Sequence, residues 1–228
     1  MGELGLTLRV VVVLDAGAAR GRDLAALAAA ARGGGATMLQ VRAKTLGAGD
    51  LAALTRRIIE AAGGLPVVVN DRLDVALAAG AAGCHLGQDD FPLADARAVA
   101  TPGFVLGGSA GTEAEALRAA AAGADYLGIG PIRGTRHKAD AGEAIGAAGF
   151  ARVLGAAAGL PAVAIGGVTA ADVPDLIGAG AAGVAAIGAV LDAEDPGVAA
   201  RALREAVDAA MKRGAPGHGG TGARATTE

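Results

Sequence analysis

The amino-acid sequence predicts an α/β fold, a (β/α)8 TIM barrel built as a single domain. Its 228 residues, of which 53% are hydrophobic, are enough for one sizeable core and fall within the range of a single α/β barrel. Short β-branched runs alternate with longer Ala- and Leu-rich segments whose apolar residues recur three or four positions apart, which is typical of strand–helix units around a parallel sheet. A Gly-Ala step also precedes every second strand, so the units repeat in pairs.

Eight strands can be assigned along the chain. Two of them follow a Gly-Leu-Pro step, where glycine ends a helix and proline blocks its continuation. Eight parallel strands favour a closed barrel because closure removes both unpaired edges. An open doubly wound sheet is the alternative, but no Gly-x-Gly-x-x-Gly follows the first strand. The predicted strands span residues 8–14, 37–41, 67–69, 83–86, 104–106, 126–129, 162–165 and 183–187, and predicted helices between them include 23–32, 51–62, 113–122 and 198–212.

Composition narrows the classes of partner. The formal net charge of -3 gives no basic field for nucleic acid or for an anionic membrane, and aromatic residues (2%) are too few for a base-stacking platform. We therefore expect small-molecule substrates, no nucleic acid and no membrane, and we leave a homo-oligomer open. The one cysteine, Cys84, cannot form an internal disulfide, and the first apolar run is too short for a signal peptide, so we expect a cytoplasmic protein.

The end of the chain differs from the rest. From residue 214 the sequence GAPGHGGTGARATTE has no apolar periodicity. We therefore predict a barrel catalytic domain over residues 1–213 and a disordered C-terminal tail over residues 214–228.

Uncommon polar residues gather in one part of the predicted barrel. The chain has one Asn, one Ser, two Gln and three Lys against seventeen Arg. All but Lys212 are predicted at the ends of strands, at the C-terminal mouth where active sites of this fold lie. Ordinary loop polarity is the alternative, but the opposite loops contain none of these residue types. The residues at the mouth are Gln40, Lys44, Asn70, Gln88, Ser109 and Lys138.

Gln40, Arg42 and Lys44 are spaced by two, so on an extended strand their side chains share one face. A solvated edge strand is the alternative, but a closed barrel has no edge. Two cations on this face, with no acidic residue beside them in the sequence, indicate a site for a multiply charged anion.

Carboxylates follow two neighbouring strands. Asp71 closes the third strand, and Asp89 and Asp90 follow the fourth. Oxygen ligands without a Cys/His cluster suit Mg²⁺, which takes one or two carboxylates together with phosphate oxygens and water. Helix N-capping is the alternative. We assign Asp89 to capping and leave both readings open for Asp71 and Asp90.

Three further loops favour phosphate binding. The longest loop places four polar or basic residues in a row after the sixth strand, although a solvated basic loop is an alternative. Glycines after the seventh and eighth strands let backbone N–H groups approach an anion, although Gly-Gly can also simply shape a turn. Cys84 and His85 lie inside the predicted fourth strand. We expect Cys84 to be a packed thiol and His85 a hydrogen-bonded imidazole, and we assign neither residue a catalytic role. The predicted phosphate-site residues are Thr135, Arg136, His137, Lys138, Gly167, Ile187 and Gly188.

On these residues the chain resembles the thiamine phosphate synthase family from residue 8 to about residue 212. The motifs that carry the resemblance are QVRAK (40–44), VNDR (69–72), HLGQDD (85–90), GGSAGT (107–112), GADYLGIGPI (123–132), Lys138, AIGGVT (164–169) and GVAAIGAV (183–190).

The resemblance implies a transferase of thiamine biosynthesis. It would join the methylene of aminopyrimidine methyl diphosphate to the thiazole nitrogen of a thiazole phosphate, or of its carboxylated form, and release pyrophosphate. By resemblance, Asp71 and Asp90 hold Mg²⁺, while Gly167 and the Ile187-Gly188 step bind the thiazole phosphate. Catalytic roles are implied for Lys44, Ser109 and Lys138. The residues implied to hold the pyrimidine diphosphate are Gln40, Arg42, Lys44, Asn70, Ser109 and Lys138.

Some positions depart from the family pattern. They cluster on the thiazole phosphate side, and they bear on which thiazole form is accepted. There are two alternative functions. One is a thiazole tautomerase, which needs neither diphosphate nor metal and against which Asp71, Asp90 and Lys44 speak; the other is a noncatalytic barrel that senses a thiamine precursor. The departures are Gly111 in place of a common His, Arg133-Gly134 in place of Tyr-Pro, His137 in place of a second Thr, and Gly188 in place of a Ser.

Overall fold

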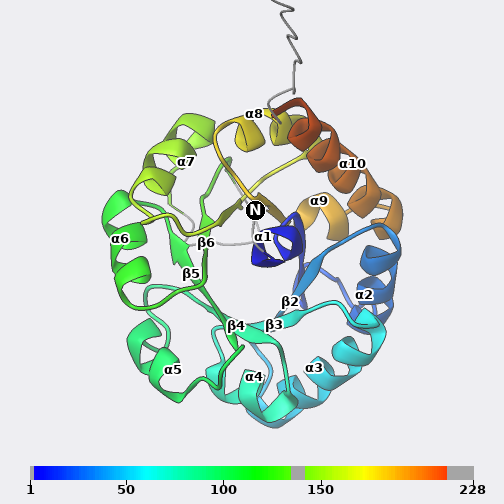
Figure 1. Ribbon diagram of the computed structural model, residues 1–228. Coiled ribbons are helices and arrows are strands. Elements are labelled where there is room, and N and C mark those ends of the chain that lie inside the picture. Colours follow the sequence, from blue (N-terminus) through cyan, green and yellow to red (C-terminus); the bar gives the residue numbers. More distant parts are fainter. Residues whose placement is uncertain (1–2, 135–141, 215–228) are drawn as a thin grey trace, which may run out of the picture.

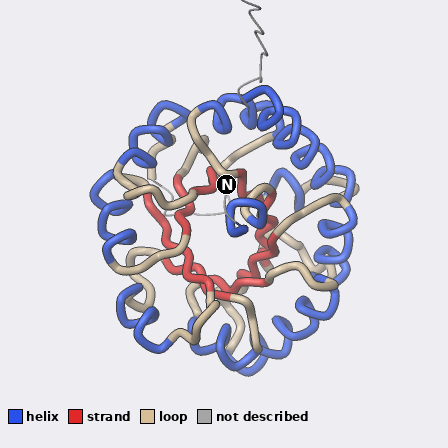
Figure 2. Tube along the Cα trace, viewed as in Figure 1, coloured by secondary structure: helices blue, strands red, loops and turns tan. Residues whose placement is uncertain are grey.

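A computed structural model of the chain describes residues 3–134 and 142–214. Eight parallel strands close into a barrel in sequence order, and helices surround the ring of strands (Figures 1 and 2). The predicted (β/α)8 fold is confirmed. The strands are β1 (Val10–Asp15), β2 (Met38–Arg42), β3 (Val67–Asn70), β4 (Gly83–Leu86), β5 (Val105–Ala110), β6 (Tyr126–Ile129), β7 (Ala162–Ala164) and β8 (Gly183–Ala186).

The helices begin where capping residues allow. Asp23 accepts a hydrogen bond from the Ala25 amide at the start of α2, and Thr112 forms a capping box with Glu115 at the start of α6. The helix α10 packs against α2 and α8 and so completes the outer ring. The helices are α1 (Glu3–Thr7), α2 (Leu24–Gly33), α3 (Ala48–Ala62), α4 (Leu73–Ala79), α5 (Leu93–Val99), α6 (Glu113–Ala121), α7 (Gly146–Gly155), the 3₁₀ turn η1 (Ala170–Asp172), α8 (Val173–Gly178), α9 (Gly188–Leu191) and α10 (Pro196–Gly214).

The fifth strand is longer than the sequence pattern predicts. It was expected to end at Leu106, but β5 continues to Ala110 because Gly107 and Gly108, which are poor strand formers in isolation, extend the pairing with β6. Ser109 therefore lies within a strand rather than in a loop. Asn70 is likewise the last residue of β3.

Apolar side chains close the N-terminal end of the barrel interior. A buried cluster there includes Val11, Met38, Val68 and Tyr126, and Leu8 from the segment after α1 joins it. Helix α1 lies across the centre of the ring in Figures 1 and 2. Each fully buried side chain of this size contributes roughly 1.5–3 kcal/mol to folding. The inward-facing polar side chains consequently lie toward the opposite, C-terminal end.

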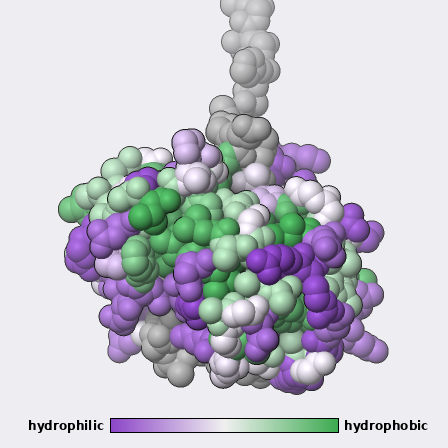
Figure 3. All heavy atoms as spheres, turned by 90° about the horizontal axis from the view of Figure 1, so that it is seen from below, coloured by the Kyte–Doolittle hydropathy of each residue, from purple (hydrophilic) through white to green (hydrophobic). Residues whose placement is uncertain are grey.

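The outer surface mixes hydrophilic residues with apolar patches on the face shown in Figure 3. Exposed large apolar residues include Leu77 on α4 and Phe91 before α5. None of the helices in the described part of the chain is both long and apolar enough to cross a lipid bilayer.

Candidate active site

A cavity of about 1120 Å³ opens at the C-terminal ends of the strands. It brings together every predicted site residue that the structure describes. Thr135, Arg136, His137 and Lys138 lie outside the described residues. The predicted residues that line the cavity are Gln40, Arg42, Lys44, Asn70, Asp71, Asp90, Ser109, Gly167, Ile187 and Gly188.

Two amides form the floor of this cavity on neighbouring strands. Gln40 pairs in register with Val68 of β3, so Gln40 and Asn70 share the inward face. The Gln40 Nε2 donates a hydrogen bond to Asn70 Oδ1 at 2.7 Å, and Gln40 is only 5% exposed. The pair fixes which amide faces present donors and acceptors to a ligand.

Arg42 has an acidic partner, which corrects the expectation from the sequence. The β1–β2 register places Asp15 opposite Arg42, and the two side chains form an ion pair. The other Asp15 oxygen accepts a hydrogen bond from the Ala18 amide at 2.8 Å. Asp15 was missed because it lies 27 residues away in sequence, and only the register between strands reveals the pair. Part of the Arg42 charge is therefore balanced before any anion binds.

Asp71 and Asp90 form an acidic pair on the adjacent side of the cavity. Burial, with a hydrogen bond and negative charge from Asp90, raises the pKa of Asp71 to about 6, while Lys44 and Arg42 act in the opposite direction. The Asp71 backbone has φ 64, and its amide donates to the His85 carbonyl at 2.8 Å. Asp90 is held by the Gly87 amide at 2.6 Å. Two neighbouring carboxylates of this kind attract a cation.

Helix capping does not explain these aspartates. Helix α4 begins after Arg72 and α5 after Pro92, and neither helix has a side-chain cap. The assignment of Asp89 to capping was therefore wrong, because Pro92 separates it from the helix. No group of three or more His, Cys, Asp or Glu suited to a metal occurs among the residues that the structure describes. The carboxylate pair alone fits Mg²⁺ that also takes phosphate oxygens and water.

His85 lines the cavity, although no catalytic role was predicted for it from the sequence. Its Nε2 lies 3.0 Å from Ser109 Oγ, and its Nδ1 lies 3.1 Å from the Tyr126 hydroxyl. The expected hydrogen-bonded imidazole is confirmed, but its partners include a predicted site residue. The position of His85 in the sequence could have indicated this role. His85 pairs in register with Asn70 of β3, so its side chain faces the same, inward side of the barrel.

Glycine-rich turns form the opposite side of the cavity. Gly166 and Gly167 have φ values of 90° and 69°, and a Cβ on Gly167 would lie 2.9 Å from Arg133 Cβ. The turn is held by Asp172, which accepts from the Thr169 amide at 2.9 Å and from Arg133 Nε at 2.8 Å. Burial tends to raise the pKa of Asp172, but the bonds from Arg133 and Thr169 outweigh it and lower the pKa.

Comparison with known proteins identifies the family. A family model described as thiamine monophosphate synthase matches residues 10–190. The chain belongs to the thiamine monophosphate synthase family. It is 50% identical over 208 residues to a thiamine-phosphate synthase of Methanoculleus marisnigri, covering 89% of this chain and 97% of that one. It is 44% identical over 214 residues to a thiamine-phosphate synthase of Chloroflexus aurantiacus, covering 90% and 95%.

A solved structure of the same family supports the fold. The thiamine phosphate pyrophosphorylase from Pyrococcus furiosus superposes with a TM-score of 0.83 at 32% identity, over 92% of this chain and all of that one. The predictions of a thiamine phosphate synthase, a transferase of thiamine biosynthesis, are thereby confirmed for this family member. The roles of individual residues remain predictions.

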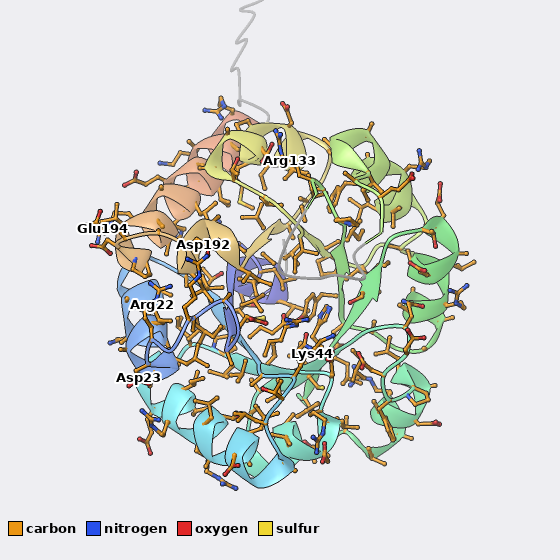
Figure 4. The ribbon with its side chains drawn as sticks, turned by 180° about the vertical axis from the view of Figure 1, so that it is seen from behind. Arg22, Asp23, Lys44, Arg133, Asp192 and Glu194 are labelled. Carbon is orange, nitrogen blue, oxygen red and sulfur yellow. The ribbon has the colours of Figure 1, made fainter. Side chains whose placement is uncertain are left out.

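Arg22 connects the loop after β1 with α9, whose first residue, Gly188, lines the cavity. Arg22 extends from the β1–α2 loop to the end of α9, where it bonds the carbonyl of Leu191, and it bonds Ala19 in its own loop at 3.2 Å. Figure 4 shows Arg22 close to Asp192, just after α9. The sequence did not single it out among seventeen arginines.

Burial raises the pKa of Cys84 to about 12, in agreement with a packed, unreactive thiol.

Proposed function

We propose that this chain condenses 4-amino-2-methyl-5-(diphosphomethyl)pyrimidine with 4-methyl-5-(2-phosphoethyl)thiazole, or with its carboxylated form, to give thiamine phosphate. The bond between the pyrimidine methylene and the diphosphate oxygen breaks, and the methylene carbon bonds to the thiazole nitrogen. Pyrophosphate leaves with the electron pair, and the carboxylated thiazole would in addition lose its carboxylate as CO2. The observation that carries the proposal is the convergence of Lys44, Asp71, Asp90 and Ser109 on one cavity that has glycine turns opposite them.

The leaving group needs positive charge around it. Negative charge builds on the departing diphosphate, and positive charge builds on the methylene carbon. Lys44 and Lys138 are assigned to the diphosphate, with Ser109 as a hydrogen-bonding group beside them. An exposed ion pair contributes only about 0–1 kcal/mol, so these cations act efficiently where the cavity excludes water.

Mg²⁺ is the proposed cofactor, held by Asp71 and Asp90. When bound, Mg²⁺ would neutralise charge on the diphosphate oxygens. The fit rests on the neighbouring carboxylates, whose mutual repulsion is relieved by a cation, and on the lack of a capping role for either. Because two carboxylates leave positions open on the ion, the substrate itself is expected to complete its coordination.

The remaining assignments divide the cavity between the two substrates. Gln40, Arg42 and Asn70 are assigned to the pyrimidine diphosphate, and the amide pair supports this because it presents fixed donors and acceptors. The thiazole phosphate is assigned to the glycine turns, where a phosphate anchor converts a bimolecular encounter into an oriented one. The residues assigned to that phosphate are Thr135, Arg136, His137, Gly167, Ile187 and Gly188.

Several properties outside the site are also proposals. The catalytic domain spans residues 1–213, and the predicted disordered tail, 214–228, lies outside the described residues except for Gly214 at the end of α10. A reducing cytoplasm suits a chain whose one cysteine is buried and unpaired with another. A homo-oligomer remains a prediction.

The decisive experiment is turnover by the purified protein with both substrates, with and without Mg²⁺. We expect thiamine phosphate and pyrophosphate in equal amounts, dependent on Mg²⁺. A tautomerase would convert the thiazole alone, and a sensor would bind without product; either result would overturn the proposal.

Lys138→Ala should weaken use of the diphosphate far more than Lys212→Ala, which changes an exposed residue of α10. Equal effects would remove the special role of Lys138.

A further inference from the structure

We infer that His85, held in one tautomer by Tyr126, fixes the Ser109 hydroxyl as a hydrogen-bond donor to the substrate. His85 and Tyr126 are thus positioning residues that act through Ser109. The identity of the substrate rests on the proposed function. The direction of the hydroxyl follows from the contacts among these three residues.

The three groups form a line from the closed core to the cavity. The Tyr126 hydroxyl lies 3.1 Å from His85 Nδ1, and His85 Nε2 lies 3.0 Å from Ser109 Oγ. Tyr126 is 1% exposed and is not among the residues that line the cavity, whereas His85, 7% exposed, and Ser109 both line it. The imidazole therefore connects a phenol that a ligand cannot reach with a hydroxyl that it can.

The surroundings of Tyr126 decide which group donates. Its ring packs among apolar side chains that include Met38, Val68 and Val163. Among the described residues, the one hydrogen bond of its hydroxyl is that with His85. If Nδ1 carried the imidazole proton, the phenol O–H would point into this apolar cluster without an acceptor, which is strongly disfavoured. Burial also raises the pKa of Tyr126, so the phenol keeps a proton to donate.

The consequence passes through the ring to Ser109. A neutral imidazole carries one N–H, so when Nδ1 accepts from Tyr126, Nε2 carries the proton and donates to Ser109 Oγ. The Ser109 proton cannot then be given to His85. It is directed to an acceptor atom of the pyrimidine diphosphate in the cavity. A Ser109 that donated to His85 would instead offer only lone pairs to the ligand.

Two glycines keep this arrangement in place. A Cβ on Gly107 would lie 2.4 Å from His85 Nδ1 and 2.4 Å from Tyr126 Cζ. A Cβ on Gly128 would lie 3.0 Å from His85 Cε1. The glycines of β5 and β6 thus leave a space that the imidazole and the phenol fill.

The first test measures the tautomer directly. We suggest ¹⁵N spectroscopy of the full chain at about two pH units above the ordinary imidazole pKa of about 6.5. The His85 signals are identified by their loss in His85→Gln. The expected result is a proton on Nε2 and none on Nδ1, with a shift toward the other tautomer in Tyr126→Phe. A proton on Nδ1, or no change in Tyr126→Phe, would overturn the inference.

The second test asks whether His85 acts through Ser109. We expect His85→Leu to lower kcat, and to lower it no further once Ser109→Ala is present, because the two changes remove one interaction. His85→Gln keeps an N–H donor near the Nε2 position and should retain more activity. Cys84→Ala, next in β4 but facing the outer core, is the matched control and should leave kcat unchanged. Independent losses from His85→Leu and Ser109→Ala would contradict the inference.

The two proposals can fail separately. If the wild-type chain makes no thiamine phosphate, the proposed function fails while the tautomer measurement still stands. If the wild type is active but carries the imidazole proton on Nδ1, only the present inference fails.

Discussion

Gln40 donates a hydrogen bond to Asn70 at 2.7 Å across β2 and β3, which makes the two amides one unit at the floor of the cavity. The sequence placed both residues at the barrel mouth but not in contact. Because Gln40 is 5% exposed, its amide belongs to the packed interior as well as to the site. The pair should therefore affect both folding stability and ligand binding.

Gln40→Met keeps a similar volume but removes the amide, so Asn70 Oδ1 loses its donor. An unsatisfied buried acceptor costs about 1–3 kcal/mol, and we expect about 1 kcal/mol here because water reaches the cavity when no substrate is bound. The free energy of unfolding in urea measures the effect. Gln88→Met removes an amide at an exposed position, where water can replace its 2.7 Å bond to the Ser109 carbonyl, and should change stability less. A similar loss in both variants would show that the amide pair has no special role.

The acidic pair gives a prediction about the metal. Asp71→Asn and Asp90→Asn should each lower Mg²⁺-dependent pyrophosphate release by at least roughly 100-fold, since a catalytic metal contributes several kcal/mol. Asn is chosen at position 71 because it tolerates the φ of 64 found there. The readout is the rate as a function of Mg²⁺ concentration. Asp95→Asn, on the exposed face of α5, is the control, and rates like those of the control would remove the metal assignment.

The raised pKa of Asp71 gives a prediction about stability and pH. Its pKa is about 6 in the folded chain against 3.8 for an ordinary aspartate, so the folded state binds the proton more tightly. The stabilisation from this proton is full below about pH 4 and is lost as the pH rises through about 6. Without metal, Asp71→Asn should therefore raise the unfolding temperature at pH 7 more than at pH 4. Equal differences at the two pH values would argue against the shift.

The parts of the fold that the sequence predicted correctly are those that depend on patterns among residues close together in the chain. The alternation of strands and helices depends on residues close together in the chain, so all eight strands were assigned to the right segments. The shared face of Gln40, Arg42 and Lys44 follows from the two-residue period of a strand, and all three line the cavity. The mouth itself follows from the fold, because parallel strands bring their carboxyl ends together.

The features that were not predicted depend on pairing between distant segments. Asp15 meets Arg42 only because of the β1–β2 register. The extension of β5 through Gly107 depends on the neighbouring strand and on the rings that fill the space over it. The prediction that Asp89 caps a helix was wrong for a local reason. Helix α5 begins only after Pro92, three residues beyond Asp89.

Arg22 provides a prediction about the thiazole phosphate side. Its guanidinium bonds the carbonyls of Ala19, at 3.2 Å, and of Leu191, so it ties the β1–α2 loop to the end of α9. Gly188, at the start of α9, lines the cavity. Because α9 is only four residues long, releasing one end should displace the other.

Arg22→Met removes these hydrogen bonds and keeps a similar stem. A hydrogen bond from a charged donor contributes about 1.5–3 kcal/mol. We expect about half of this free energy to be lost from ligand binding through the displaced start of α9, so KM for the thiazole phosphate should rise roughly tenfold. KM for the pyrimidine diphosphate should stay the same. Arg20→Met is the matched control, because the Arg20 side chain is 68% exposed and its ion pair with Asp192 contributes little. Equal increases in both KM values, or the same increase in Arg20→Met, would show that Arg22 does not act through α9.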